Sequence, residues 1–181
     1  MRDRIDPLIK DRAPWLFRQS VPAAFSRPAL NWLLGYTRTV SLAQDFEHLT
    51  SADIMNAMAD RLARRVSVSG LGLVPRRGAG LIVANHPTGI ADGIILHSAL
   101  RQIRDDAYYF ANHDILKVLP QMEDMIAPVE WRKNRRSHAK TRETMVFARK
   151  AVQDGRLGVI FPSGRLAKRR GARLHERPWK E

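Results

Sequence analysis

Short apolar runs alternate with segments of helical periodicity through most of the chain. Apolar residues at positions 54, 55, 58 and 62 recur at helical spacing, which predicts a helix from Ser51, as its cap, to about Arg65. Further helices are predicted at about Ala91–Ile103 and Ser137–Gln153. Apolar runs bounded by turn residues predict strands at Gly80–Ala84, Ala107–Ala111, Ile126–Glu130 and Leu157–Phe161, and an alternating pattern predicts a further short strand at Val66–Val68.

This order of elements predicts an α/β fold. Strands and helices alternate after an N-terminal helical region, which favours a mostly parallel sheet covered by helices. We expect residues 1–50 to form the N-terminal helical region and residues 51–181 to form the second domain. Within the first, Trp15–Tyr36 interleaves aromatic and aliphatic residues with arginines. This interleaved pattern fits either segments that lie in a membrane interface or an ordinary pair of helices packed on a core.

Charge narrows the classes of partner. The 181 residues carry 31 Lys and Arg against 18 Asp and Glu, a net charge of +13, with basic clusters at 132–142 and 165–177. Such an excess favours an anionic partner: nucleic acid, acidic lipid or a phosphorylated substrate. The absence of cysteine excludes disulfides, thiolate metal sites and a cysteine nucleophile. No apolar run is long enough for a membrane span and the start lacks a secretory signal pattern, so we expect an intracellular protein.

The segment after the first apolar run carries the first candidate chemistry. Pro87 keeps His86 out of helical backbone space, Gly89 permits a tight turn, and Asp92 falls in the first turn of the next helix. The turn is therefore predicted to bring the two side chains together at a strand's carboxyl end, where ligands bind in α/β sheets. A His–Asp pair can act as a general base. The alternative is a histidine and an aspartate that merely cap the turn and the helix.

A second candidate segment follows the last apolar run. The sequence Phe161-Pro162-Ser163-Gly164-Arg165 ends a predicted strand, and it delivers Arg165 to the same edge of the sheet as His86. An arginine there suits bidentate binding of a phosphate or carboxylate, or is simply a solvated loop residue.

These segments together resemble the lysophospholipid (glycerol-phosphate) acyltransferase family. Asn85-His86-Pro87 through Asp92 is similar to its N-H-x-x-x-x-D block, and Phe161 to Arg165 is similar to its F-P-E-G-T-R block. The segment from Ala127 to Arg132 lies where the family has an arginine-bearing block, and matches less well. Five residues instead of four separate His86 from Asp92, a spacing associated with a bacterial, hemolysin-like branch, and Ser163 stands in place of the usual glutamate. The resemblance spans about residues 66–181 without the family's fourth block, so we expect a chain that is incomplete at its C-terminus.

The resemblance implies an enzyme of phospholipid metabolism. A fatty acyl group would move from acyl-CoA or acyl carrier protein to the hydroxyl of a lysophospholipid or related lyso-lipid, with His86 as base and Asp92 orienting it. Arg165, Gly164, Ser163 and Arg132 would bind the acceptor. No cofactor and no metal are implied. The protein would lie peripherally on the cytoplasmic face of the cell membrane, at an anionic lipid surface.

Two other interpretations remain open. A basic nucleic-acid-binding domain would explain the charge, although no nucleic-acid-binding motif is present and aromatic residues make up only 7% of the chain, so we expect no nucleic acid partner. A non-catalytic lipid-binding remnant would fold without turnover. Ser163 lacks the first glycine of a G-x-S-x-G elbow, which disfavours it as a nucleophile.

Overall fold

The computed structural model describes residues 1–18 and 21–179. Its contacts divide the chain into two compact units: residues 1–49 with 114–121, and residues 50–113 with 122–181.

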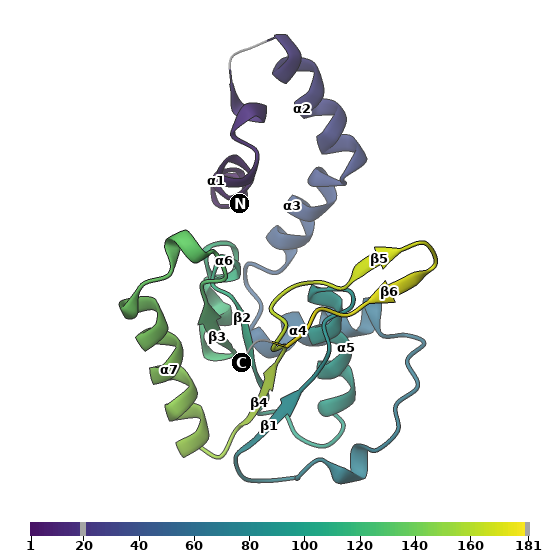
Figure 1. The fold of residues 1–181 in the computed structure, drawn as a ribbon, viewed down its shortest axis with the longest axis vertical. Helices are drawn as coiled ribbons and strands as arrows, with labels where there is room; N and C mark the ends of the chain where they lie inside the picture. Colours follow the sequence, from purple (N-terminus) through teal and green to yellow (C-terminus); the bar gives the residue numbers. More distant parts are fainter. Residues whose placement is uncertain (19–20, 180–181) are drawn as a thin grey trace. The chain divides into compact units, whose positions relative to one another are not determined.

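The first unit is helical (Figure 1). Its elements are α1 (Arg2–Arg12), η1 (Pro14–Phe17), α2 (Val21–Leu33), α3 (Tyr36–Asp45) and α6 (Asp114–Val118). The core consists of Ile5 from α1 with Val40 and Ala43 from α3. Asp6 ties the helices together, because it accepts hydrogen bonds from Arg27 at 2.8 Å and from the Tyr36 hydroxyl at 2.5 Å.

Several large apolar side chains of this unit remain in solvent. Trp32 is 84% exposed, and Leu33 and Leu34 beside it are 69% and 74% exposed. Over residues 1–18 and 21–179, no helix combines the length and apolar character needed to cross a membrane.

The second unit contains the sheet. Its helical elements are α4 (Ser51–Leu62), η2 (Leu71–Leu73), α5 (Ile90–Leu100), η4 (Lys133–Arg135) and α7 (His138–Gln153), with η3 (Pro120–Asp124) reaching it from the first unit. Its strands are β1 (Gly80–Val83), β2 (Tyr108–Asn112), β3 (Ile126–Val129), β4 (Leu157–Ile160), β5 (Lys168–Arg170) and β6 (Arg173–His175).

Strands β1 to β4 form one parallel sheet in the order β1-β4-β2-β3. The connection through α5 runs from β1 to β2 and the one through α7 runs back from β3 to β4. Since crossovers are right-handed, opposite directions place the two helices on opposite faces. Figure 1 shows α7 on one side of the sheet, with α4 and α5 on the other. The expected α/β fold with a parallel sheet and an N-terminal helical region is confirmed.

Most predicted elements lie within a few residues of their observed positions, with two corrections. Residues Val66–Val68 form no strand; they are exposed, so no neighbouring strand stabilises the alternating pattern. The cap of α4 is Thr50 instead of Ser51: its hydroxyl accepts from the Asp53 amide at 3.2 Å. The Ser51 hydroxyl instead donates to Asp124 at 2.8 Å.

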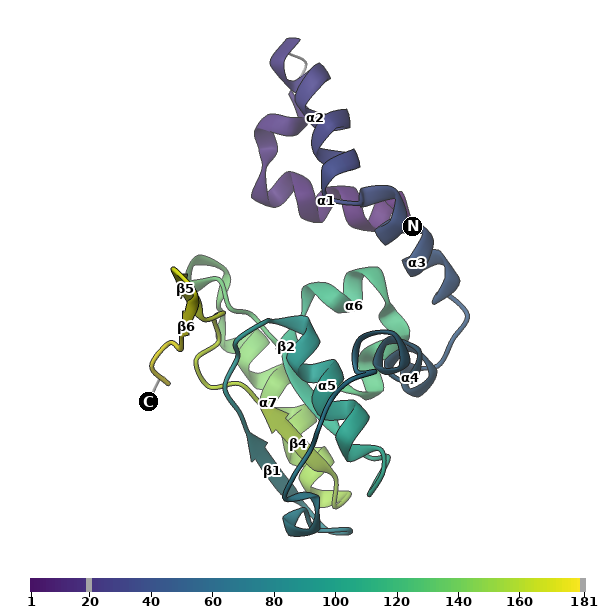
Figure 2. The same cartoon turned by 90° about the vertical axis from the view of Figure 1, so that its right-hand side faces the viewer.

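Strands β5 and β6 were not predicted. They form an antiparallel hairpin with a two-residue loop at Gly171, whose φ of 60° suits the first position of such a turn. Both views show this β5–β6 hairpin standing out beyond the ends of β1 and β4 (Figures 1 and 2).

Arg104 holds the opposite end of the sheet. Its guanidinium donates to the carbonyls of Pro75, Gly78 and Gly155 at 2.8–3.0 Å, and it forms a bidentate pair with Asp106 at 2.6 Å. These groups lie just before β1, β4 and β2. One side chain, itself only 4% exposed, therefore fixes where three neighbouring strands begin.

Replacing Arg104 by alanine is expected to lower the free energy of unfolding by about 3 kcal/mol or more, because buried carbonyls and a carboxylate lose their hydrogen-bond partner. Urea denaturation followed by circular dichroism measures the change. Arg101→Ala is the control: it removes an exposed arginine paired with Asp60 and should cost less than about 1 kcal/mol. Equal losses in both variants would contradict the assigned role.

Candidate active site

The residues that follow β1 and β4 lie side by side. The two strands are paired as far as Val83 and Ile160, and the Ala84 amide continues the ladder by donating to the Ile160 carbonyl at 3.1 Å. The next side chains meet: the His86 ring stacks on Phe161 with centroids 4.5 Å apart and planes inclined by 26°. The parallel pairing predicted for this edge therefore brings the two candidate segments together.

His86 and Asp92 are in contact. Nδ1 of His86 lies 3.0 Å from Oδ2 of Asp92, and the side chains are 19% and 10% exposed. The structure thus confirms that the turn closes the gap between them, which a continuous helix over the same residues would not do.

The Asp92 carboxylate also stabilises the turn that places it beside His86. Gly89 is the N-cap of α5, with φ of 93°, a value that favours glycine. Asp92 is the third helical residue and accepts from the amides of Thr88 at 3.0 Å and Gly89 at 2.9 Å, and from the Thr88 hydroxyl at 2.5 Å. An acidic side chain at this position satisfies amides that the helix cannot, and it is favoured by the helix dipole.

Nδ1 of His86 is close to the Asp92 carboxylate without the alignment of a hydrogen bond. A carboxylate at this distance favours a proton on Nδ1, which leaves the lone pair on Nε2. A His–Asp pair is an arrangement that can serve as a general base, and here Asp92 also caps the helix.

The loop after β4 is held by its own serine. Ser163 is 2% exposed, and its hydroxyl donates to the carbonyl of Arg165 at 3.0 Å. Gly164 between them has φ of 56°. The Arg165 side chain is exposed. The buried hydroxyl thus shapes the loop, and the cation that the loop presents faces solvent.

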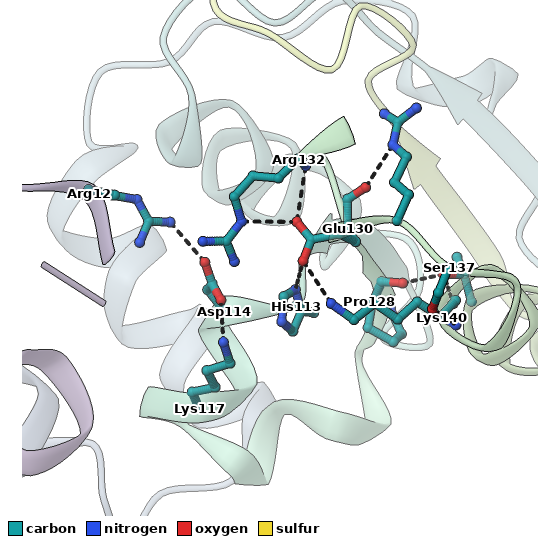
Figure 3. Close-up of polar contacts among 11 residues, drawn as sticks. Arg12, His113, Asp114, Lys117, Pro128, Glu130, Arg132, Ser137 and Lys140 are labelled. Atoms are coloured by element: carbon teal, nitrogen blue, oxygen red, sulfur yellow. Dashed lines mark hydrogen bonds and ion pairs between the residues drawn. The ribbon is translucent and has the colours of Figure 1, made fainter. Parts of the chain in front are cut away.

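Arg132 belongs to a different cluster, centred on Glu130 at the end of β3 (Figure 3). Glu130 accepts from the amide and Nε of Arg132 at 3.0 and 3.1 Å, and from Lys140 at 2.9 Å. His113, which follows β2, places Nδ1 3.6 Å from the same carboxylate. The backbone carbonyl of Glu130 accepts from Arg136 at 3.1 Å.

Burial alone would raise the pKa of Glu130, whose side chain is 2% exposed. Hydrogen bonds from Lys140 and Arg132 outweigh burial and hold that pKa at about 2. The carboxylate is therefore ionised at neutral pH and organises the start of the basic segment 132–142.

Sequence patterns did not identify Thr88, Phe161 or Glu130 as parts of the site. Thr88 and Phe161 lie within the two candidate segments, but their contacts depend on how the loops fold. His97, on α5, bonds to Tyr109 at 3.2 Å and Asn56 at 3.1 Å instead of joining His86. Within the described part of the chain, no group of His, Asp and Glu side chains is placed to hold a metal ion.

Comparisons with known proteins identify a family for most of the second unit. The protein-family model named Acyltransferase matches residues 65–180. The chain is 22% identical over 138 residues to the lyso-glycine lipid O-acyltransferase of Phocaeicola vulgatus, covering 76% of this chain and 48% of that protein. It is 26% identical over 129 residues to the enzyme of the same name from Bacteroides thetaiotaomicron, covering 71% and 46%. The chain therefore spans about half the length of these curated relatives. No solved structure matches it at a significant level.

Glu130 predicts a pH dependence of stability. Its folded pKa of about 2 lies below the ordinary value of 4.5, so the ionised carboxylate stabilises the fold above pH 4.5. That contribution should be lost as the pH falls from about 4.5 to 2. Urea denaturation of the wild type and of Glu130→Gln measures it: the wild type should be the more stable at pH 7, and the difference should shrink across this range. A difference independent of pH would contradict the prediction.

Proposed function

We propose that this chain, which belongs to the acyltransferase family, transfers a fatty acyl group from a thioester to the hydroxyl of a lyso-lipid, with His86 as general base. The observation that carries the proposal is the 3.0 Å contact between His86 and Asp92 at the carboxyl end of β1, inside the region that matches the family. The names of the two relatives, both lyso-glycine lipid O-acyltransferases, support a lyso-lipid acceptor.

The proposed reaction needs no covalent enzyme intermediate. The proton of the acceptor hydroxyl moves to Nε2 of His86 as the oxygen bonds to the thioester carbonyl carbon. Asp92, against Nδ1, stabilises the positive ring. The carbon–sulfur bond then breaks, and the departing sulfur takes the proton from Nε2. The products are an ester and a free thiol, and His86 is again neutral.

Arg165 is proposed to bind an anionic group of the acceptor, because it is exposed on the loop that follows Phe161, whose ring stacks on His86. Ser163 and Gly164 shape that loop. Arg132 is proposed to add positive charge, with its orientation set by Glu130. The donor is proposed to be acyl-CoA or acyl carrier protein.

We place the protein at the cytoplasmic face of the cell membrane as a peripheral protein. A lyso-lipid acceptor is found at a membrane surface. The exposed Trp32, Leu33 and Leu34 are side chains that suit the headgroup region of a bilayer.

His86→Ala is expected to lower kcat/KM for acyl transfer by about 10²–10⁴-fold, because it removes the base. Asp92→Asn should lower kcat by about 10²-fold or more with little change in KM, because it acts through His86. Release of the free thiol from the thioester donor measures both rates.

The matched control for these two variants is His138→Gln, an exposed histidine on α7, which should keep the wild-type rate. Circular dichroism and thermal melting should show all three variants folded. Wild-type turnover in folded His86→Ala would exclude the proposed mechanism.

Arg165→Ala is expected to raise KM for an anionic lyso-lipid by about tenfold while kcat changes little, since a charge-assisted contact to the acceptor is lost. Initial rates over a range of acceptor concentrations give both constants. Arg142→Ala, which removes an exposed arginine from α7, is the control and should leave KM unchanged. An unaltered KM in Arg165→Ala would remove this residue from the acceptor site.

A further inference from the structure

The segment that contains the β5–β6 hairpin is fastened to the candidate site at both of its ends. On the incoming side, the Ala167 amide donates to the His86 carbonyl at 3.1 Å. Leu166 packs so closely on Gly89 that a Cβ there would lie 3.0 Å from its Cδ2. On the outgoing side, the Trp179 indole donates to Asn85 at 3.2 Å. The segments on both sides of the hairpin therefore contact the turn that brings His86 and Asp92 together.

The hairpin itself is a two-stranded ribbon with every strand residue exposed. Its register places Lys168 opposite His175, Arg169 opposite Leu174, and Arg170 opposite Arg173. Because residues directly opposite share a face and neighbours alternate, one face carries Lys168, Arg170, Arg173 and His175. Like charges directly opposite are destabilising, and an isolated two-stranded hairpin is marginal in water. An anionic surface against this face would relieve the repulsion.

Exposed apolar side chains accompany these cations. Leu174 lies with Arg169 on the reverse face of the hairpin and is 55% exposed, and Leu166 and Trp179, on either side of the hairpin in the chain, are 51% and 52% exposed. Cations interspersed with Leu and Trp are typical of segments that lie on a lipid surface, where basic groups meet headgroup phosphates and apolar groups enter the interface. A hairpin that binds nucleic acid would also use the cations, but exposed leucines would contribute less to that binding.

We propose that the β5–β6 hairpin is an arm that docks on an anionic phospholipid surface and holds the His86–Asp92 pair close to it. The choice of lipid over other polyanions rests on the proposed function, since a lyso-lipid acceptor lies in such a surface. The arm differs from the Trp32 region, which belongs to the other unit.

Vesicle binding tests the arm without requiring turnover. The probes are vesicles of phosphatidylcholine alone and of phosphatidylcholine with 30% phosphatidylglycerol, sedimented with the full chain in about 0.1 M salt. The arm variant replaces the Lys and Arg residues of the cationic face, Lys168, Arg170 and Arg173, by glutamine and leaves Arg165 intact. The control variant replaces three exposed arginines elsewhere in the same unit by glutamine, which lowers the net charge equally: Arg77, Arg142 and Arg149.

The wild type should bind the anionic vesicles in preference to the neutral ones. The arm variant should bind the anionic vesicles about 100-fold more weakly, because each basic side chain at such a surface contributes about fivefold. The control variant should lose less than about tenfold. A milder variant, Arg170→Gln with Arg173→Gln, should lose about 25-fold and covers the case in which the triple substitution disturbs folding.

Three results would overturn the proposal: wild-type binding by the arm variant, equal losses in the arm and control variants, or no preference of the wild type for anionic vesicles. The arm variant could instead bind a 20-base-pair DNA duplex more weakly than the wild type and bind vesicles equally well. That result would assign the hairpin to nucleic acid. His86→Ala should bind vesicles as the wild type does. If this variant kept wild-type turnover, the proposed function would be rejected, and the conclusion from vesicle binding would still hold.

Discussion

The Asp92 carboxylate is the constraint on which the site depends. It accepts the Thr88 and Gly89 amides and the Thr88 hydroxyl, and it lies against Nδ1 of His86. The amide contacts begin α5, and the contact with His86 orients the imidazole. Helix initiation and ring orientation therefore share a single side chain. A turn that failed to form would leave both the helix end and the imidazole without their partner.

The parallel topology explains why such a turn can carry chemistry. All four strands of the main sheet end at one edge, so loops that are distant in sequence become neighbours there. The order β1-β4-β2-β3 sets the His86 turn beside the Phe161 loop, and His113 beside Glu130. The first pair of loops places the His86 ring against Asp92 and Phe161. The second gathers cations around a buried carboxylate.

The sequence predicted this edge best where the chain has few conformational choices. Pro87 and Gly89 restrict the backbone so strongly that the turn between His86 and Asp92 could be inferred before any contact was known. The pairing of Arg132 with Glu130 could not be inferred from the sequence. It also involves Lys140 from α7, a partner that only the tertiary structure supplies. The β5–β6 hairpin escaped prediction for another reason: runs of Lys and Arg carry no apolar alternation, and only Gly171 marks the turn. At Val66–Val68 the pattern was wrong because no neighbouring strand was available to pair with it.

The stacking of Phe161 on His86 has a stereochemical consequence. The phenyl ring covers one flat side of the imidazole. In the proposed reaction the lone pair of Nε2 lies in the plane of the imidazole, so the alcohol approaches the rim of the ring. Bulk next to its oxygen on the stacked side would meet the phenyl group. An aromatic residue that forms no bond with the alcohol thereby limits the shape of the acceptor.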